Sequence, residues 1–180
     1  EFNEDYLNYS SYFIKDKALF GSYPTQEQVE ILKKNGVKVF VNLTETTENL
    51  PEYEVDNSIL KLRYEIRDRK VPTNYKKFSG FIIYLSRIIS NLTNNKIYIH
   101  CRGGHGRAGL VTACLISYIN KIHPTLSLEM TNKYHNERKI MRECWREVGS
   151  SQTLPQHNFV KKICGFFYFS KAYPYGPTTG

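Results

Sequence analysis

Apolar and polar residues alternate in two short segments of the chain, and a period of two is typical of β-strands. In residues 37–43, Val37, Val39, Val41 and Leu43 alternate with Lys38, Phe40 and Asn42. The second segment runs from Leu60 to Ile66, and a third, Lys96 to His100, is a brief run of β-branched and aromatic residues. The pattern therefore predicts at least three strands.

Other segments carry apolar residues every three or four positions, which is the spacing of an amphipathic helix. The longest runs from Phe78 to Leu92 and stops before Asn94 and Asn95. A shorter helix follows Thr25, which forms a capping-box pattern with Gln28, and Asn35-Gly36 ends it. Further helices are expected over residues 107–120, 124–139 and 155–167.

Helices and strands thus alternate along the chain, which predicts an α/β fold with a central, mostly parallel sheet flanked by helices. A length of 180 residues suits one domain. We expect this domain over residues 1–170, followed by a loosely held tail over 171–180. Hydrophobic residues make up 41% of the chain, with 11 Gly and 7 Pro, so the disordered and collagen-like classes are excluded.

Several features indicate the compartment. No apolar run approaches the ~20 residues of a membrane-spanning helix, and residues 1–9 lack the layout of a secretory signal. The cysteines show no C-x-x-C pair and no spacing that suggests a disulfide framework; they are Cys101, Cys114, Cys144 and Cys164. We therefore expect a cytoplasmic protein in a reducing, intracellular setting, while the sequence leaves the oligomeric state open.

The net charge of +8 is spread unevenly. Residues 1–60 carry 5 basic and 11 acidic side chains, giving −6, whereas residues 61–107 carry 11 and 2, giving +9. The remaining 73 residues carry 9 and 4, giving +5. A cationic middle third attracts anions, but charge alone does not choose between phosphate esters, nucleic acid and anionic lipid.

The segment between the third strand and the helix over 107–120 carries the candidate chemistry. It reads Cys101-Arg102-Gly103-Gly104-His105-Gly106-Arg107, and its three glycines allow successive backbone N–H groups to point inward. Such a hollow at a helix N-terminus favours a tetrahedral anion and, at its mouth, a thiolate over a thiol. We therefore predict Cys101 as a nucleophile and Arg107 as a bidentate clamp on phosphate oxygens.

The pattern H-C-x5-R between strand and helix resembles the signature of the cysteine-dependent protein tyrosine phosphatase superfamily, and the short loops resemble its dual-specificity branch. The resemblance extends over residues 19–163. It implies a general acid about thirty residues before the cysteine in a D-x-x-x-P loop, which Asp68 to Pro72 fits. A solvated, charge-paired aspartate is the alternative for Asp68.

The reaction implied by this resemblance has two steps and needs no cofactor or metal. The Cys101 thiolate displaces the ester oxygen from phosphorus while Asp68 donates a proton, and Asp68 then activates water to hydrolyse the phosphocysteine. The glycine-rich segment and Arg107 hold the phosphate oxygens. The phosphate-binding residues would be Arg102, Gly103, Gly104, His105, Gly106 and Arg107.

Four further residues are expected to support the site. His100 holds the segment by hydrogen bonds, and Ala108 stands where many family members have Ser or Thr, which predicts slow hydrolysis of the phosphocysteine. Gln152 and Gln156 either position water or cap and cover the last helix. The other cysteines are expected to be core or incidental positions.

Two other segments match a dinucleotide-binding motif and a zinc site only superficially. Gly104-x-Gly106-x-x-Gly109 has dinucleotide-binding spacing, but the acidic residue at about the right distance, Glu129, lies in a helical pattern rather than at a strand end. His100, Cys101, His105 and Cys114 lack the second closed pair of a zinc finger.

The substrate class stays open among several phosphate esters. A phosphorylated protein is favoured, since dual-specificity action is the commonest activity of small members with this layout. Positive charge at Arg102 and His105 resembles the branch that acts on phosphoinositides or inositol polyphosphates. An RNA 5′-triphosphatase is less favoured, as is any nucleic-acid partner, and a phosphate-binding module without turnover is disfavoured by the presence of Cys101, Asp68 and Arg107.

Overall fold

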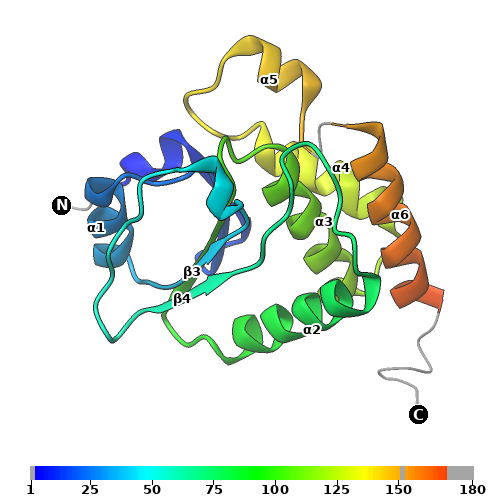
Figure 1. The fold of residues 1–180 in the computed structure, drawn as a ribbon, viewed down its shortest axis with the longest axis horizontal. Helices are drawn as coiled ribbons and strands as arrows, with labels where there is room; N and C mark the ends of the chain where they lie inside the picture. Colours follow the sequence, from blue (N-terminus) through cyan, green and yellow to red (C-terminus); the bar gives the residue numbers. More distant parts are fainter. Residues whose placement is uncertain (1–2, 151–152, 170–180) are drawn as a thin grey trace.

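The computed structural model describes residues 3–150 and 153–169, which form a five-stranded sheet with helices on both faces (Figure 1). The expected tail over 171–180 and Gln152 lie outside the described residues. The strands are β1 (Ser10–Ile14), β2 (Ala18–Gly21), β3 (Val37–Asn42), β4 (Leu60–Arg63) and β5 (Lys96–His100). The helices are α1 (Gln26–Lys34), α2 (Tyr75–Asn91), α3 (Gly106–Asn120), α4 (Pro124–His135), α5 (Glu143–Val148) and α6 (Leu154–Phe169), with short 3-10 helices η1 (Asp5–Asn8) and η2 (Thr46–Glu48).

The strand order is β1-β2-β5-β3-β4, and only β1 is antiparallel to its neighbour. The predicted α/β fold with a mostly parallel sheet is therefore confirmed. β5 lies at the centre between β2 and β3, so the segment after His100 emerges at the carboxyl edge of the sheet. Open α/β sheets bind their ligands at this edge.

Both faces of the sheet are buried, which gives its central strands their continuous apolar character. Ile97 and Ile99 of β5 belong to a core shared with α2, α3, α4 and α6, whereas Tyr98 belongs to a second core shared with α1. Phe40, which the alternation places on the side of Lys38, is fully buried in this second core. Alternation in β3 thus separates two apolar faces rather than an apolar face from a solvated one.

Most predicted boundaries agree with the structure. The capping box at α1 is present, since Thr25 Oγ1 accepts from the Gln28 amide at 3.1 Å and Gln28 Oε1 accepts from the Thr25 amide at 2.9 Å. α4 ends at His135, four residues before the predicted end. β4 ends at Arg63, although the segment to Ile66 stays beside the end of β3, where the Ile66 amide donates a hydrogen bond to Leu43 O at 3.0 Å.

Two strands and one α-helix were not predicted, nor were the two short 3-10 helices. β1 and β2 form an edge hairpin, and β2 shows no alternation because all four of its residues are buried. α5 has only six residues, too few for a helical period to stand out. Figure 1 shows α5 projecting at one end of the molecule, beyond the carboxyl edge of the sheet. Within the described residues, no helix is both long and apolar enough to cross a membrane.

Candidate active site

The glycine loop, residues 101–106, connects β5 to α3 at the carboxyl edge of the sheet. Cys101 is 3% exposed, and the backbone amide of Gly104 donates a hydrogen bond to its Sγ at 3.3 Å. Gly104 has φ +80°, and a Cβ there would lie 2.3 Å from the Gly21 carbonyl carbon. Only glycine therefore fits, and the position of the amide that faces the sulfur depends on it.

Arg107 lies in the first turn of α3 and is 1% exposed. Its Nη1 donates to Glu48 Oε2 at 2.7 Å and to the carbonyl of Ile66 at 3.0 Å, and its Nη2 donates to Glu48 Oε1 at 3.1 Å. Burial opposes the charge, but the hydrogen bonds that Arg107 donates to Glu48 and the charges of Cys101, Glu48 and Asp68 outweigh it and raise the pKa of Arg107. The guanidinium is therefore a fixed cation.

One donor of this guanidinium stays available. Among the described residues, Arg107 Nε has no hydrogen-bond partner although it is buried. A buried, unpaired donor costs free energy unless a ligand satisfies it. Together with the loop amides, the Nε–H group makes the site suited to an oxyanion.

Glu48 was not identified from the sequence. It ends η2, on the segment after β3, and its side chain is 13% exposed. Burial works against its charge, but hydrogen bonds from Arg107 and the Glu45 amide and the positive charges of Arg107 and Arg102 lower its pKa overall. The residue lies 59 positions from Arg107 in the sequence, so only the parallel arrangement of β3 and β5 brings the two together.

Asp68 lies on the segment between β4 and α2, with its side chain 57% exposed. Its Oδ1 is 3.3 Å from Arg107 Nη2, so the predicted acid stands beside the predicted clamp. A turn follows directly, with Arg69 at φ +64° and the Lys70 amide bonded to Arg67 O at 3.0 Å. The exposed position allows the carboxyl group to reach a bound ester.

Gln156 ties this segment to α6. Its Nε2 donates to Lys70 O at 3.1 Å, and its Oε1 accepts from the Thr153 amide at 3.3 Å. It is fully buried and packs so closely on the glycine loop that a Cβ at Gly106 would lie 3.0 Å from its Oε1. The structure thus places Gln156 both as a helix cap and as a bridge between the Asp68 segment and the loop.

His100 is fully buried at the end of β5. Its Nδ1 lies 3.3 Å from Cys101 O and its Nε2 lies 2.8 Å from the Tyr53 hydroxyl. Burial lowers the pKa of His100 to about 3, so the ring is neutral at neutral pH. A carbonyl only accepts, so Nδ1 carries the proton and Tyr53 donates to Nε2. His100 therefore contacts the loop backbone and not the sulfur.

His105 does not supply the positive charge that we expected from it. Its Nδ1 is 2.7 Å from His135 Nε2, and its ring stacks on Trp145 with centroids 5.2 Å apart. Burial and the charge of Arg138 lower the pKa of His105 to about 3, with His135 contributing further. The ring is therefore neutral at neutral pH. Arg102 is exposed at the surface, so it remains a cation of the loop.

Arg138 was also missed by the sequence analysis. It follows α4, is 3% exposed, and its Nη2 donates to Gly104 O and to Phe20 O, the latter at 3.4 Å. Burial lowers its pKa to about 10, while the charges of Tyr98 and Cys101 oppose this shift. No carboxylate pairs with it among the described residues. Arg138 lies 37 positions after Cys101 in the sequence, and no local motif indicates that it contacts the glycine loop.

Ala108 and the other three cysteines differ in burial and in what they offer to the site. Ala108 is fully buried in the first turn of α3 and offers no hydroxyl. Cys114 is also fully buried, and burial raises its pKa well above its ordinary value, so it stays a thiol. Cys164 is buried beside it and Cys144 is exposed, and both are free. In the described part of the chain, no three His, Cys, Asp or Glu side chains come together as metal ligands.

Comparison with known families gives one match over more than half of the chain. Residues 17–120 match the family described as "Polymorphic toxin system, DSP-PTPase phosphatase". This range begins one residue before β2 and ends with α3, so it includes Asp68, the glycine loop and Arg107.

Curated relatives and solved structures agree with this match. "Putative tyrosine phosphatase 067L" of Invertebrate iridescent virus 3 is 41% identical, covering 89% of this chain and 68% of that protein. "Putative tyrosine phosphatase 197R" of Invertebrate iridescent virus 6 is 44% identical, covering 83% of this chain and 60% of that protein. The crystal structure of Tk-PTP in the active form superposes with a TM-score of 0.67 at 20% identity, over 87% of this chain and 96% of that one.

Proposed function

Because the chain belongs to the cysteine-dependent protein tyrosine phosphatase superfamily, as a phosphatase of the tyrosine or dual-specificity type, we propose that it hydrolyses phosphate monoesters on proteins through a phosphocysteine at Cys101. One observation carries this proposal. Beside a buried sulfur that accepts an amide hydrogen bond, the buried guanidinium of Arg107 keeps one unpaired donor. This arrangement suits a phosphate group presented to a nucleophile.

In the first step, the Cys101 thiolate attacks phosphorus in line with the ester oxygen. The S–P bond forms as the P–O bond breaks, and Asp68 in its acid form gives its proton to the departing oxygen. The 3.3 Å distance between Asp68 Oδ1 and Arg107 Nη2 supports this role, because Arg107 would hold the phosphate within reach of the carboxyl group.

In the second step, Asp68 as carboxylate accepts a proton from water while the water oxygen attacks phosphorus. The S–P bond breaks, inorganic phosphate forms, and the thiolate returns. Arg107 Nε–H and the loop amides stabilise the equatorial oxygens in both steps. Glu48 touches no reacting atom in this scheme and acts as a positioning residue by holding both Nη groups of Arg107.

The thiolate mechanism needs Cys101 in its reduced form. All four cysteines are free in the structure. We therefore also propose a reducing, cytoplasmic setting, which fits the absence of disulfide spacing in the sequence. The substrate within this proposal is a phosphorylated tyrosine, serine or threonine side chain, and inositol phosphates are the alternative that Arg102 favours.

The proposal is tested by single-turnover and steady-state assays on a phosphotyrosine peptide, a phosphoserine peptide, an inositol polyphosphate and triphosphorylated RNA. The phosphotyrosine peptide should give the highest kcat/KM, and Cys101→Ser should abolish turnover while it still binds the peptide. Asp68→Asn should slow esters with poor leaving groups more than an activated aryl phosphate. Turnover by Cys101→Ser, or equal losses on both ester types for Asp68→Asn, would contradict the mechanism.

A further inference from the structure

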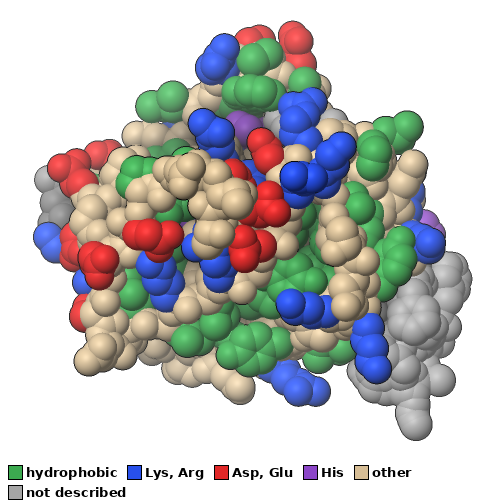
Figure 2. Space-filling model, viewed as in Figure 1, with side chains coloured by type: hydrophobic (Ala, Val, Ile, Leu, Met, Phe, Trp, Pro, Cys, Tyr) green, Lys and Arg blue, Asp and Glu red, His purple; other side chains and the backbone are tan. Residues whose placement is uncertain are grey.

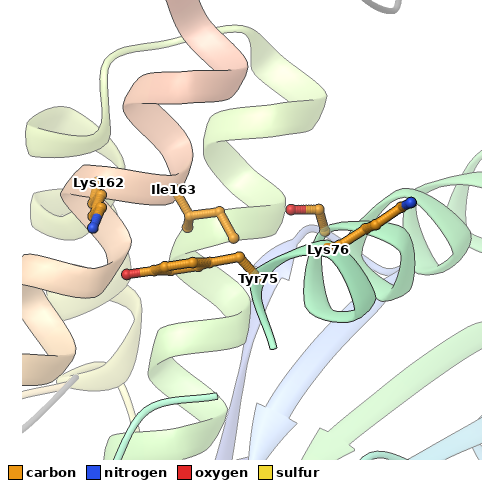
Figure 3. Close-up of a pocket in the computed structure, with 5 residues that line it drawn as sticks. Tyr75, Lys76, Lys162 and Ile163 are labelled. Carbon is orange, nitrogen blue, oxygen red and sulfur yellow. The ribbon is translucent and has the colours of Figure 1, made fainter. Parts of the chain in front are cut away.

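A hollow of about 430 Å³ lies between α2 and α6, lined by Tyr75, Lys76, Ser79, Lys162 and Ile163, and we call it the α2–α6 groove. Figure 3 shows Tyr75 and Ile163 facing each other, with Lys162 on α6 to one side and Lys76 on α2 to the other. The mechanism uses none of these residues.

The apolar part of the groove is an aromatic platform. The Tyr75 ring stacks on Phe159 with centroids 5.2 Å apart and planes inclined by 16°, yet Tyr75 is 46% exposed. Lys162 Nζ lies 5.0 Å from the centroid of the Tyr75 ring. A half-exposed ring held by stacking offers a rigid surface for an apolar side chain at low entropic cost.

The charge around this platform has a single sign. α2 carries Lys76, Lys77 and Arg87, α6 carries Lys161 and Lys162, and neither helix contains an acidic residue. No acidic residue occurs anywhere from position 69 to 128. Figure 2 shows the same contrast on one face of the molecule, where Asp and Glu gather toward the side of α1, with Lys and Arg among them, and are absent over α2 and α6.

Both helices of the groove also connect to the active-site segments. α2 begins seven residues after Asp68, and Gln156, in the first turn of α6, bonds to Lys70 O. The two helices that form the groove thus hold the segment that carries the proposed acid. A polypeptide with its phosphorylated residue in the glycine loop could extend along the Asp68 segment into the groove.

From these observations we propose that the α2–α6 groove docks an acidic segment of the phosphoprotein substrate, with one apolar side chain on Tyr75 and carboxylates beside Lys76 and Lys162. The inference rests on the proposed function, since it names a feature of that same substrate. Charge complementarity selects this occupant, because both lysines at the rim are cations without an acidic neighbour on their own helices.

The test compares two phosphotyrosine peptides that differ only in flanking residues, one with Glu and Leu and one with Gln and Ser. The wild type should show a KM several-fold lower for the acidic peptide at low ionic strength, and the difference should shrink in high salt. Lys162→Glu should raise that KM about 5- to 10-fold, as expected from reversing an exposed charge pair. Its kcat and its rate on a small aryl phosphate should not change.

A matched control separates this effect from net charge. Lys34→Glu on α1 makes the same change at an exposed lysine on the far side of the sheet and should leave both peptides unaffected. Tyr75→Ala should raise the KM of only the peptide that carries Leu. Equal KM values for the two peptides in the wild type, or equal effects of Lys34→Glu and Lys162→Glu, would overturn the docking proposal.

Direct binding distinguishes failure of the groove from failure of the proposed function. Fluorescence anisotropy with an unphosphorylated acidic peptide should show binding that Lys162→Glu weakens, whether or not any ester is hydrolysed. Vesicles of anionic phospholipid serve as the rival occupant. If Lys162→Glu abolishes vesicle binding but leaves peptide binding unchanged, the groove binds a lipid surface and the proposal is wrong.

Discussion

Arg107 and Arg138 are both almost fully buried beside the glycine loop, but different groups balance their charges. Two carboxylates contact Arg107, and its pKa is raised despite burial, whereas only backbone carbonyls accept from Arg138, and burial lowers its pKa to about 10. Burial alone therefore does not set the direction in which the pKa of a buried arginine shifts. The presence or absence of a carboxylate partner decides that direction.

The different partners of Arg107 and Arg138 also suit the two side chains to different roles near Cys101. Glu48 fixes both Nη groups of Arg107, and the proposed mechanism assigns the unpaired Nε–H group to a phosphate oxygen. Arg138 has no carboxylate partner among the described residues, and only the charges of Tyr98 and Cys101 oppose the lowering of its pKa by burial. Within the proposed mechanism, Arg138 is therefore a positioning residue, because its Nη2 donates to the Gly104 carbonyl of the glycine loop.

The largest effect is expected from Arg107→Lys. A lysine keeps the charge but cannot pair with Glu48 through two nitrogens while it donates to phosphate through a third. Loss of one oxyanion donor typically costs about 10²- to 10³-fold in kcat. Steady-state kinetics on an aryl phosphate, with circular dichroism as the folding control, measures it. A loss below tenfold would show that the fork geometry of Arg107 does not matter.

Glu48→Gln comes next, because it alters only the orientation of Arg107. The amide accepts with one oxygen and faces the guanidinium with an NH₂ group, so one charge-assisted hydrogen bond is lost. Such bonds contribute about 1.5–3 kcal/mol, and kcat should fall about 10- to 100-fold. Glu48→Asp, which retains the charge, should recover part of this loss, and no recovery would point to shape rather than charge.

Glu48→Gln should also change how the free energy of unfolding depends on pH. The folded state lowers the pKa of Glu48, so its contribution to the free energy of unfolding is present above about pH 4.5 and is lost as the pH falls further. The difference in unfolding free energy between wild type and Glu48→Gln should therefore shrink on acidification below pH 4.5. Urea unfolding at several pH values measures it, and a constant difference would contradict the ion pair.

The comparison of the two arginines also shows how far the sequence leads. Arg107 was predicted because it is six residues from Cys101, within one strand, loop and helix whose local patterns are clear. Arg138 and Glu48 reach the same site from 37 residues after the cysteine and 53 before it, through turns that carry no periodic signal. The sequence therefore predicted the local chemistry, while the partners that orient it follow from the sheet topology.

The same reasoning explains which parts of the fold were found. β3 was predicted to within one residue at each end, and α2 to within one residue at its end and three at its start, because both have clear periodic patterns. β2 is buried on both faces and shows no period, so the edge hairpin was missed. His105 was assigned a charge because the sequence does not reveal that His135 and Trp145 enclose it.

Arg138→Gln should lower kcat/KM less than the Arg107 and Glu48 variants do, and it should also slow the alkylation of Cys101. Glutamine can still donate to Gly104 O but carries no charge, so the thiolate loses a nearby cation. We expect kcat/KM to fall about 3- to 10-fold and the alkylation of Cys101 at neutral pH to slow by a similar factor. Arg138→Lys, which keeps the charge, should restore both rates. A loss in kcat/KM without slower alkylation would mean that Arg138 acts only as a structural support.

The smallest effect is expected from Ala108→Ser, which adds a donor next to Arg107 without altering either arginine. A hydroxyl there can donate to the Cys101 sulfur as the S–P bond breaks, so the second step should accelerate about 2- to 5-fold, the effect of one added hydrogen bond of about 0.5–1 kcal/mol. Because Ala108 is fully buried, Ala108→Gly serves as a control that changes packing without adding a donor. Rapid-quench measurements should show a burst of phosphocysteine in the wild type that shrinks in Ala108→Ser and persists in Ala108→Gly. A wild type without a burst would place the slow step before phosphocysteine forms, and the position after Arg107 would then not limit turnover.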